Sequence, residues 1–566
     1  MLRLRPISVF TVLMLAFFPP LGKAQDFPQP PAGSSAEIVE KKVTEEAKDE
    51  VLEEKTEEAP GPEKERPTPS PGAAEVRTRI NRILLRGELI LPLETFEPLL
   101  GEFQERELAF RDFQVLISKI EDIYRTKGYF AVVYLPPQRI EAGEVTLEVL
   151  VARMGTVEVE GHRYSSGRKI RSYWKIPKGE TLLYDRIRES MIEMNQNPDR
   201  LVRSVLHAGK EAGTTDVTLK VEERFPTHLG YTFDNQGVKL TGKERTGFTF
   251  RHNNLLRLDD IFLVGTVFGQ DFGALFLQHL IPLNSRGTRL ALGFTHAQVN
   301  PQKEFKLFGI NGISQNYSLA LRQRLLRNDR FSLETYLGFD FKEKRTRVQS
   351  VTSAWDRLRV LSPGIEFQAR DKTGVWSLGQ DFAFGFSPHG DGFPLTSRAA
   401  ESRFFKYGFY LNRQQKLFRG TRGVVQLKGQ LSPDKLTPQE EIFMGGASTV
   451  RGYPESDYLA DQGILTNVEF WTPFFLAPKA WRLPLAQESL REQIQLVSFL
   501  DYGYGRLTSP GEREHSSRTL LGIGAGFQIR FRKYVSARLE WGVPLKDDPL
   551  TESGSSQFHF RLKLDI

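Results

Sequence analysis

Two absences limit what this chain can be. It has no cysteine in 566 residues, which excludes disulfides, cysteine-ligated metals, iron–sulfur clusters and thiol catalysis. It also lacks the ~18 consecutive apolar residues of a membrane-spanning helix, which excludes a helical membrane protein. The nine histidines are scattered without metal-ligand spacing, and no GxSxG nucleophile motif occurs. We therefore expect no enzymatic activity, no metal, no cofactor and no nucleic-acid partner.

The N-terminus has the pattern of a secretory signal. Arg3 and Arg5 form a short basic region, and residues 7–18 are almost all apolar. Gly22-Lys23-Ala24 then supplies small residues at the two positions that a signal peptidase reads. We expect a signal peptide over residues 1–24 and export of the remaining chain from the cytoplasm.

A charged leader follows the signal. Residues 37–66 carry twelve acidic and six basic residues, whereas the net charge of the whole chain is +7. Residues 36–58 place valine or alanine at every fourth position among Glu and Lys, which predicts one helix with a narrow apolar stripe. Such a helix is marginal alone and needs a docking surface; a solvated charged segment is the alternative. Residues 59–72 are a proline-rich linker, so residues 25–75 are interpreted as a helix and its linker.

Residues 76–224 contain an internal repeat. Both 76–152 and 153–224 predict the order strand, helix, helix, strand, strand, which indicates a duplicated small α+β domain. The expected elements are strands over 80–86, 129–135 and 144–151 and a helix over 112–126 in the first copy, then strands near 157–160, 201–207 and 216–222 and a helix near 184–196 in the second.

The remainder, residues 225–566, predicts a transmembrane β-barrel. Apolar and polar residues alternate over 521–531, 535–543 and 558–566, and 32 of the 41 phenylalanines lie in this part. Alternation also occurs in soluble β-sandwiches, but an exported chain with many phenylalanines favours lipid-facing bands and aromatic girdles. At roughly 21 residues per strand and connection, we expect about 16 antiparallel strands.

Two short motifs stand out in the barrel. Residues 444–453 are glycine-rich and end in Val450, Arg451, Gly452 and Tyr453, and Phe499, Asp501 and Gly503 share one face of a strand. If that face points into the lumen, Asp501 needs a cation, and the guanidinium fork of Arg451 can bind a carboxylate with two hydrogen bonds. Two ordinary exposed charges are the alternative. The motif Gly522-x-Gly524-x-Gly526 lies within a strand and indicates a thin barrel wall rather than a dinucleotide site.

With these motifs, residues 76–566 resemble the outer-membrane translocators of two-partner secretion, the haemolysin secretion/activation protein family (ShlB/FhaC-like), in the superfamily of polypeptide-transport barrels. Val450-Arg451-Gly452-Tyr453 resembles the superfamily's inward-folded loop, expected near 444–458, and Phe499-x-Asp501-x-Gly503 resembles its partner on the barrel wall. The two repeated units resemble polypeptide-transport-associated (POTRA) domains. The first copy carries the signature residues Gly128, Tyr129, Leu135, Pro136, Pro137, Gln138 and Gly143. The second copy carries Asn197, Pro198, Asp199 and Arg200, followed by Gly209 and Gly213.

The resemblance implies a fold and a function. The fold is a barrel of about 16 strands preceded by two periplasmic POTRA domains, with an N-terminal helix able to occupy the pore. The function is recognition of an unfolded exoprotein of haemolysin or adhesin type, through its N-terminal secretion domain, and its translocation across the outer membrane. Outer-membrane lipid and the barrel assembly machinery are the other implied partners.

One departure and three alternatives accompany this reading. Barrels of the outer membrane usually end in an aromatic residue, whereas this chain ends in Ile566. The superfamily's assembly factors generally have more POTRA domains. A diffusion porin has no reason to carry the two α+β units or the Arg451 motif, and a surface adhesin would carry long repeats.

Overall fold

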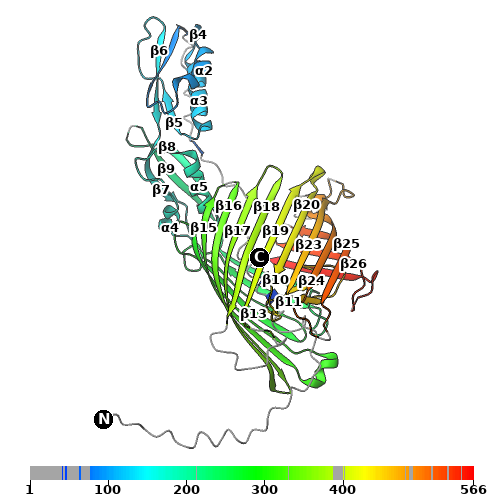
Figure 1. Ribbon diagram of the computed structural model, residues 1–566. Helices are drawn as coiled ribbons and strands as arrows, with labels where there is room; N and C mark the ends of the chain where they lie inside the picture. Colours follow the sequence, from blue (N-terminus) through cyan, green and yellow to red (C-terminus); the bar gives the residue numbers. More distant parts are fainter. Residues whose placement is uncertain are drawn as a thin grey trace, which may run out of the picture.

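The computed structural model describes residues 41–42, 45–46, 63–64, 77–211, 213–328, 330–386, 400, 402–478, 480–482, 489–511, 514–531, 534–549 and 551–566. Two small α+β units come first in the chain and a large barrel follows them. In Figure 1 the two units are stacked at one end of the barrel. None of the helices described is both long enough and apolar enough to cross a membrane.

The first unit packs helices on one face of a three-stranded sheet. The sheet order is β3-β6-β5, with β3 parallel to β6 and β5 antiparallel to it. The apolar side of α3 buries Phe113, Leu116, Ile120 and Tyr124 against this sheet, because positions three to four apart share a helix face. The elements are β2 (Thr78–Ile80), β3 (Arg82–Gly87), η3 (Leu93–Thr95), α2 (Glu97–Gly101), β4 (Arg106–Leu108), α3 (Phe110–Thr126), β5 (Ala131–Tyr134) and β6 (Glu144–Val151).

The second unit has the same topology. Its strand β7 is parallel to β9 and β8 is antiparallel to β9, so the order β7-β9-β8 repeats that of the first unit. The predicted order strand, helix, helix, strand, strand is present here as β7, α4, α5, β8 and β9, and the first unit adds the short elements β2, η3 and β4. The elements are β7 (Arg153–Glu160), α4 (Gly167–Ser172), α5 (Tyr184–Met194), β8 (Arg200–Ala208) and β9 (Thr214–Glu223).

The barrel closes with sixteen antiparallel strands, and its first strand, β10, pairs with its last, β27. The strand number matches the expectation, but β16 and β17, with 18 and 20 residues, are longer than a typical membrane strand. The strands are β10 (Thr227–Asp234), β11 (Arg245–His252), β12 (Ile261–Phe268), β13 (Phe272–Pro282), β14 (Thr288–Val299), β15 (Asn311–Arg327), β16 (Phe331–Val348), β17 (Val351–Arg370), β18 (Gly374–Phe386), β19 (Phe404–Lys416), β20 (Arg422–Leu431), β23 (Gln462–Pro473), β24 (Ile494–Arg506), β25 (Ser517–Phe531), β26 (Val535–Pro544) and β27 (Gln557–Asp565).

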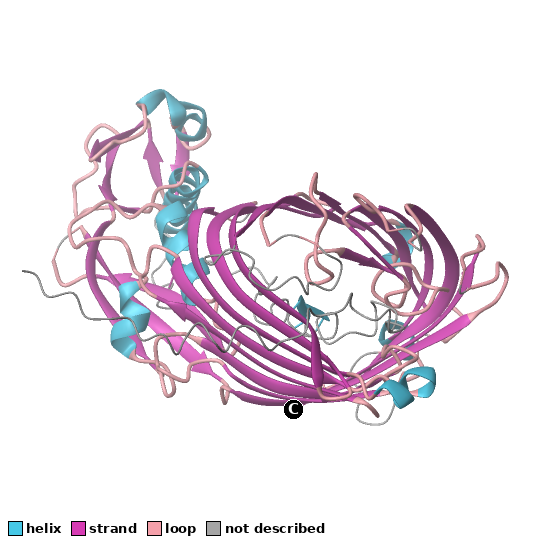
Figure 2. Ribbon diagram, turned by 60° about the horizontal axis from the view of Figure 1, so that its bottom comes forward, coloured by secondary structure: helices cyan, strands magenta, loops and turns pink. Residues whose placement is uncertain are grey.

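The connection from β20 to β23, residues 432–461, starts at the end of the barrel far from the α+β units and folds into the lumen; Figure 2 shows loops inside the ring of strands. It contains the short hairpin β21 (Ile442–Met444) and β22 (Tyr458–Ala460). Met444, Val450 and Tyr453 form a buried apolar cluster with Leu465 and Leu520 of the barrel wall. We call residues 432–461 the inward loop.

Two expectations fall largely outside the described residues. The signal peptide over 1–24 lies wholly outside them. Of the helix expected over 36–58, the structure describes Lys41, Lys42, Glu45 and Glu46, which have helical backbone.

Candidate functional site

Arg451 at the tip of the inward loop binds Asp501 on β24. Its Nε lies 2.7 Å from Asp501 Oδ2 and its Nη2 lies 2.7 Å from Oδ1, so the guanidinium grips both carboxylate oxygens. The backbone N–H of Arg451 donates a further hydrogen bond to Oδ2 at 3.0 Å. Arg451 and Asp501 are almost completely buried, so this is a charge-assisted contact shielded from water.

Two further carboxylates and an aromatic ring complete the surroundings of Arg451. Its Nη1 lies 2.6 Å from both Glu469 of β23 and Glu540 of β26. Its Cζ lies 3.5 Å from the centre of the Phe499 ring, a cation–π contact. Because three carboxylates face one guanidinium, a second cation is required, and Arg538 supplies it at 2.8 Å from Glu469 and 2.7 Å from Glu540.

Glycines let the tip of the loop lie directly on the barrel wall. A Cβ on Gly522 would sit 2.0 Å from the carbonyl oxygen of Arg451, and one on Gly503 would sit 2.9 Å from a methyl group of Val450. Gly452 has a φ of +99°, and a Cβ there would meet the backbone nitrogen of Pro544 at 2.7 Å. These positions leave no space for a side chain, so the glycines of this wall serve loop docking.

Tyr453 fastens the loop just beyond Arg451. Its ring is buried, and its hydroxyl donates to the carbonyl oxygen of Lys546 at 2.7 Å. All four motif residues, 450–453, thus contact the barrel wall, and each does so through a different kind of interaction.

A second ionic anchor holds the stem of the inward loop. Glu440 lies 2.7 Å from Lys342 of β16 and 2.7 Å from Lys406 of β19. The carboxylate of Glu440 is buried, and its two lysines come from strands that precede β20 in the strand order, whereas the partners of Arg451 come from β23, β24 and β26. The loop is therefore held at both its tip and its stem.

The N-terminal segment lies in the same lumen. Lys42 is 2.8 Å from Glu455 of the inward loop, and Lys41 donates to the backbone carbonyl of Glu441 at 2.6 Å. On its other side, Glu46 is 3.3 Å from both Arg245 of β11 and Arg561 of β27. The segment thus joins the inward loop through its lysines and the barrel wall through its glutamates.

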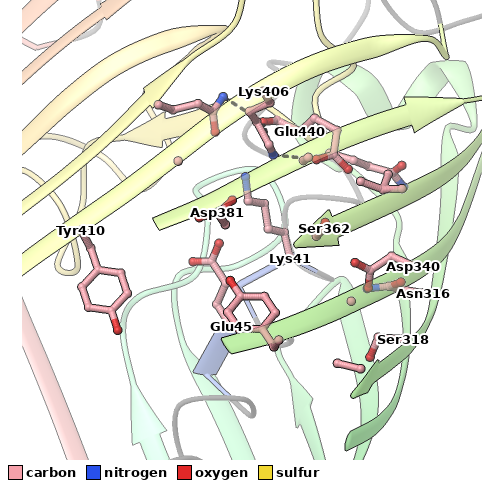
Figure 3. A pocket seen from close by; sticks show the side chains of 18 of the residues that line it. Lys41, Glu45, Asn316, Ser318, Asp340, Ser362, Asp381, Lys406, Tyr410 and Glu440 are labelled. Carbon is pink, nitrogen blue, oxygen red and sulfur yellow. Dashed lines mark hydrogen bonds and ion pairs between the residues drawn. The ribbon is translucent and has the colours of Figure 1, made fainter. Parts of the chain in front are cut away.

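A cavity of about 460 Å³ borders this segment. Its charged lining comes from the segment, the inward loop and the barrel wall, and Figure 3 shows Lys41 and Glu45 entering the same space as Lys406 and Glu440. The lumen therefore contains open volume beside the inward loop and the N-terminal segment.

Three signature residues of the second unit, Asn197, Asp199 and Arg200, lie at its joint with the barrel, whereas Gly209 and Gly213 lie in the turn between β8 and β9. Arg200 binds Asp259, in the turn from β11 to β12, with contacts of 2.6 and 2.9 Å. Asn197 donates to the carbonyl of Asn253 at 2.8 Å, and Asp199 accepts from the Asn253 side chain at 2.8 Å. These residues are buried, so they fix the position of the second unit on the barrel.

Glu223, at the end of β9, orders a loop beside this joint. Its carboxylate accepts hydrogen bonds from the backbone N–H groups of Arg163, Tyr164 and Ser165. Burial raises the pKa of Glu223, but hydrogen bonds from Ser165 and its neighbours outweigh burial and hold the pKa below its ordinary value.

The signature residues of the first unit shape turns and the joint between the two units. Gly128, with a φ of +87°, ends α3, and its carbonyl accepts the N–H of Tyr184 from the second unit at 2.9 Å. Gln138 bonds both backbone groups of Thr146 on β6, which holds the loop carrying Leu135, Pro136 and Pro137. Gly143 has a φ of +73° and abuts Asn81.

The edge strand β8 of the second unit has a partner from the linker. Glu63 and Lys64, which form β1 (Glu63–Lys64), pair in parallel with Val205 and Leu206. Backbone pairing of this kind depends little on side chains, so β8 presents an edge able to receive an extended chain.

The sequence indicated the Arg451–Asp501 pair but missed most of its surroundings. Glu469, Glu540 and Arg538 were not singled out, nor were Glu440 and Asp259. A signal was present for two of them: Glu469 and Glu540 occupy lumen-facing positions of strands, where a carboxylate requires a partner. No sequence rule pointed to Asp259, which lies in a turn.

Known proteins resemble this chain over most of its length. The family described as haemolysin secretion/activation protein ShlB/FhaC/HecB matches residues 213–529, and the ShlB-type POTRA domain matches residues 78–151. The heme/hemopexin transporter protein HuxB of Haemophilus influenzae (strain 86-028NP) is 24% identical over 84% of this chain and 85% of its own length. The outer membrane transporter CdiB of Escherichia coli O6:K15:H31 (strain 536 / UPEC) is 24% identical over 82% of this chain and 79% of its own. The solved structure of CdiB from Escherichia coli covers 96% of this chain and 100% of its own, with a TM-score of 0.66 at 19% identity.

Proposed function

The chain belongs to the haemolysin secretion/activation protein family ShlB/FhaC/HecB, and from this premise we propose that it secretes an exoprotein partner through its barrel. It is an outer-membrane transporter of two-partner secretion. The observation that carries the mechanism is the docked inward loop, held by Arg451 on Asp501 inside a closed barrel whose lumen also contains the Lys41–Glu46 segment. Both occupants are held in part by polar contacts that can be exchanged for water, so a closed conduit can open.

The two α+β units face the periplasm in this proposal. They precede the first barrel strand and lie at one end of the barrel, where an exoprotein arriving from the cytoplasm would meet them (Figure 1). The contacts of Arg200 and Asn197 with the barrel keep the second unit beside that opening. The barrel assembly machinery would insert the chain in this orientation.

Capture begins at a sheet edge. An unfolded exoprotein can add to β8 as an extended strand, through backbone hydrogen bonds that tolerate many sequences. Glu63 and Lys64 occupy part of that edge, so the incoming strand displaces the linker. The linker follows the N-terminal segment in the chain. Displacement of the linker from β8 therefore favours withdrawal of the N-terminal segment from the pore.

Passage needs no catalytic residue in this proposal. The exoprotein moves outward through the lumen, and its folding outside biases the movement because a folded segment cannot return. Purified transporter in liposomes should therefore admit its exoprotein without an added energy source. A strict requirement for such a source contradicts this step.

A comparative secretome tests the function. Culture medium from wild type, from a deletion of this gene and from the complemented deletion is compared by mass spectrometry. We expect the loss of one large protein, or very few, and its return on complementation. An unchanged medium with depletion of many outer-membrane proteins would instead establish an assembly factor, and no change in either fraction contradicts secretion.

A further inference from the structure

The hairpin of β16 and β17 carries an unusual group of arginines on its outer face. Leu337 and Phe341 are exposed on β16, and the alternation continues on that face to Arg345. On the neighbouring strand, Arg345 pairs directly with Trp355 and Phe341 pairs with Arg359. These side chains therefore leave the barrel on the side that faces lipid.

The opposite face of the same hairpin confirms this assignment of sides. Lys342 reaches Glu440 of the inward loop, and Lys344 and Asp356 are buried and lie 3.9 Å apart. Leu358 packs with Leu436 of the inward loop. Side chains alternate across a strand, so the residues between these positions point outward.

The outward arginines surround aromatic rings. The Cζ atoms of Arg345 and Arg357 lie 4.4 and 3.9 Å from the centre of the Trp355 ring, and that of Arg359 lies 4.7 Å from the centre of the Phe341 ring. Cation–π contacts orient guanidiniums without neutralising them. We call Arg345, Trp355, Arg357 and Arg359 the outer arginine cluster.

The cluster has little negative charge to balance it. Glu343 is the one carboxylate beside the cluster among the described ion pairs: it lies 3.5 Å from Arg359 and stands opposite Arg357 in the strand register, so three arginines share one negative charge. Exposed phenylalanines at 384 and 386 continue the apolar surface on β18, and Arg359 pairs with Phe386 at its border. The outer arginine cluster thus adjoins the exposed aromatic surface formed by Phe341, Phe384 and Phe386.

We propose that the outer arginine cluster binds the phosphate groups of a diphosphorylated glycolipid in the outer leaflet. Guanidinium forks bind phosphate with two hydrogen bonds, and phosphates at the border of sugar and acyl chains would meet the arginines while the chains lie along Leu337 and Phe341. Charges on a lipid-facing wall are tolerated near an interface far better than at the midplane. The cluster lies toward the end of the barrel away from the α+β units. The choice of the outer leaflet therefore rests on the proposed function, in which those units face the periplasm.

Binding to the purified full-length chain in non-ionic detergent tests the site. The probes are a diphosphorylated lipid A, its dephosphorylated form and phosphatidylglycerol, with Kd measured by native mass spectrometry. The variant Arg345→Gln/Arg357→Gln/Arg359→Gln should weaken binding of the diphosphorylated probe at least tenfold. The matched variant Arg330→Gln/Lys372→Gln/Arg419→Gln removes three cations from turns at the opposite end and should change it less than twofold.

Three results would overturn the proposal: wild-type binding by the cluster variant, equal loss in the matched variant, or equal affinity for phosphatidylglycerol or the dephosphorylated probe. If the triple variant fails to fold, as judged by its heat-dependent migration in gels, Arg357→Gln alone should still weaken binding at least threefold. Orientation is tested separately with Val351→Cys at the hairpin tip, since the chain has no other cysteine. An impermeant maleimide should label this cysteine on intact cells. Absence of labelling contradicts the orientation and therefore the choice of the outer leaflet.

Discussion

Arg451 and Asp501 stand fifty positions apart in the chain and share three hydrogen bonds of 2.7 to 3.0 Å inside the barrel. One residue belongs to the inward loop and the other to the wall. The pair therefore ties the tip of the inward loop to the wall from inside the lumen. Its strength comes from bidentate geometry in a buried site.

Replacing Arg451 by alanine should impair secretion while the barrel still assembles. Loss of one partner of a buried ion pair costs about 3–5 kcal/mol locally, and here it also leaves Asp501, Glu469 and Glu540 with too few cations. We expect at least a tenfold decrease in secreted exoprotein, measured by immunoblot of the medium. Arg413→Ala, which removes an ion pair with the exposed Asp371, is the control. Normal secretion by Arg451→Ala would show that the pair is dispensable.

Gly452→Ala tests the close approach of the loop to the wall. The added Cβ combines a φ of +99° with a contact of 2.7 Å to the Pro544 backbone, so the tip cannot dock as it does now. Secretion should fall several-fold, and a protease added to intact cells should cut the loop more readily. Gly273→Ala is matched, because a Cβ there meets nothing within 4 Å. Equal effects of the two changes would contradict a docking role for Gly452.

The N-terminal segment in the lumen should restrict ion flow through the resting pore. Lys42→Ala removes its ion pair with Glu455, and Glu46→Gln weakens its hold on Arg245 and Arg561. Either change should raise the conductance of single channels in planar bilayers, and deletion of residues 36–58 should raise it most. Conductance equal to wild type in the deletion would favour a solvated leader.

The joint between the second unit and the barrel should act as one energetic unit. Arg200→Ala and Asp259→Ala each break the same buried contact, and Arg200→Ala also removes hydrogen bonds to Met194 and Ser165, so the double variant should be little worse than Arg200→Ala alone. Thermal unfolding and proteolysis near residue 225 provide the readout for this double-mutant cycle. Arg203→Ala, on the same strand with a largely exposed partner, is the control. Additive losses from the two changes would argue against direct coupling.

Glu223 should make the second unit sensitive to acid. Its pKa is lowered in the folded chain, so its stabilising hydrogen bonds are fully present at neutral pH. Their contribution declines as the pH drops below the ordinary glutamate value of about 4.3 and is lost as the pH passes through the lowered pKa. Resistance of the joint to an acid-active protease should therefore fall over this window. Glu223→Gln should remove this part of the pH dependence. If the variant's protease resistance falls with pH as that of the wild type does, Glu223 is not the source of the acid sensitivity.

Much of the architecture was predictable because it rests on local patterns. Alternation over 521–531 and 558–566 predicts strands, since lipid and lumen impose opposite polarity on successive residues. The strands β25 (Ser517–Phe531) and β27 (Gln557–Asp565) form there. The repeated order of strands and helices over 76–224 likewise follows from periodicity. The Arg451–Asp501 contact was predictable in part, because a carboxylate on the lumen face of a strand demands a cation.

The sequence by itself determined the class of fold, the number of strands within the barrel and the two motifs that meet in the lumen. Only the tertiary structure decided what surrounds them: Glu469 and Glu540 come to Arg451 from two different strands, and Asp259 comes to Arg200 from a turn. It also decided that Lys42 faces the inward loop while Glu46 faces the wall. The reason is physical: periodicity records which side of a strand or helix is apolar, whereas a long-range ion pair depends on barrel closure and register, which no local pattern contains.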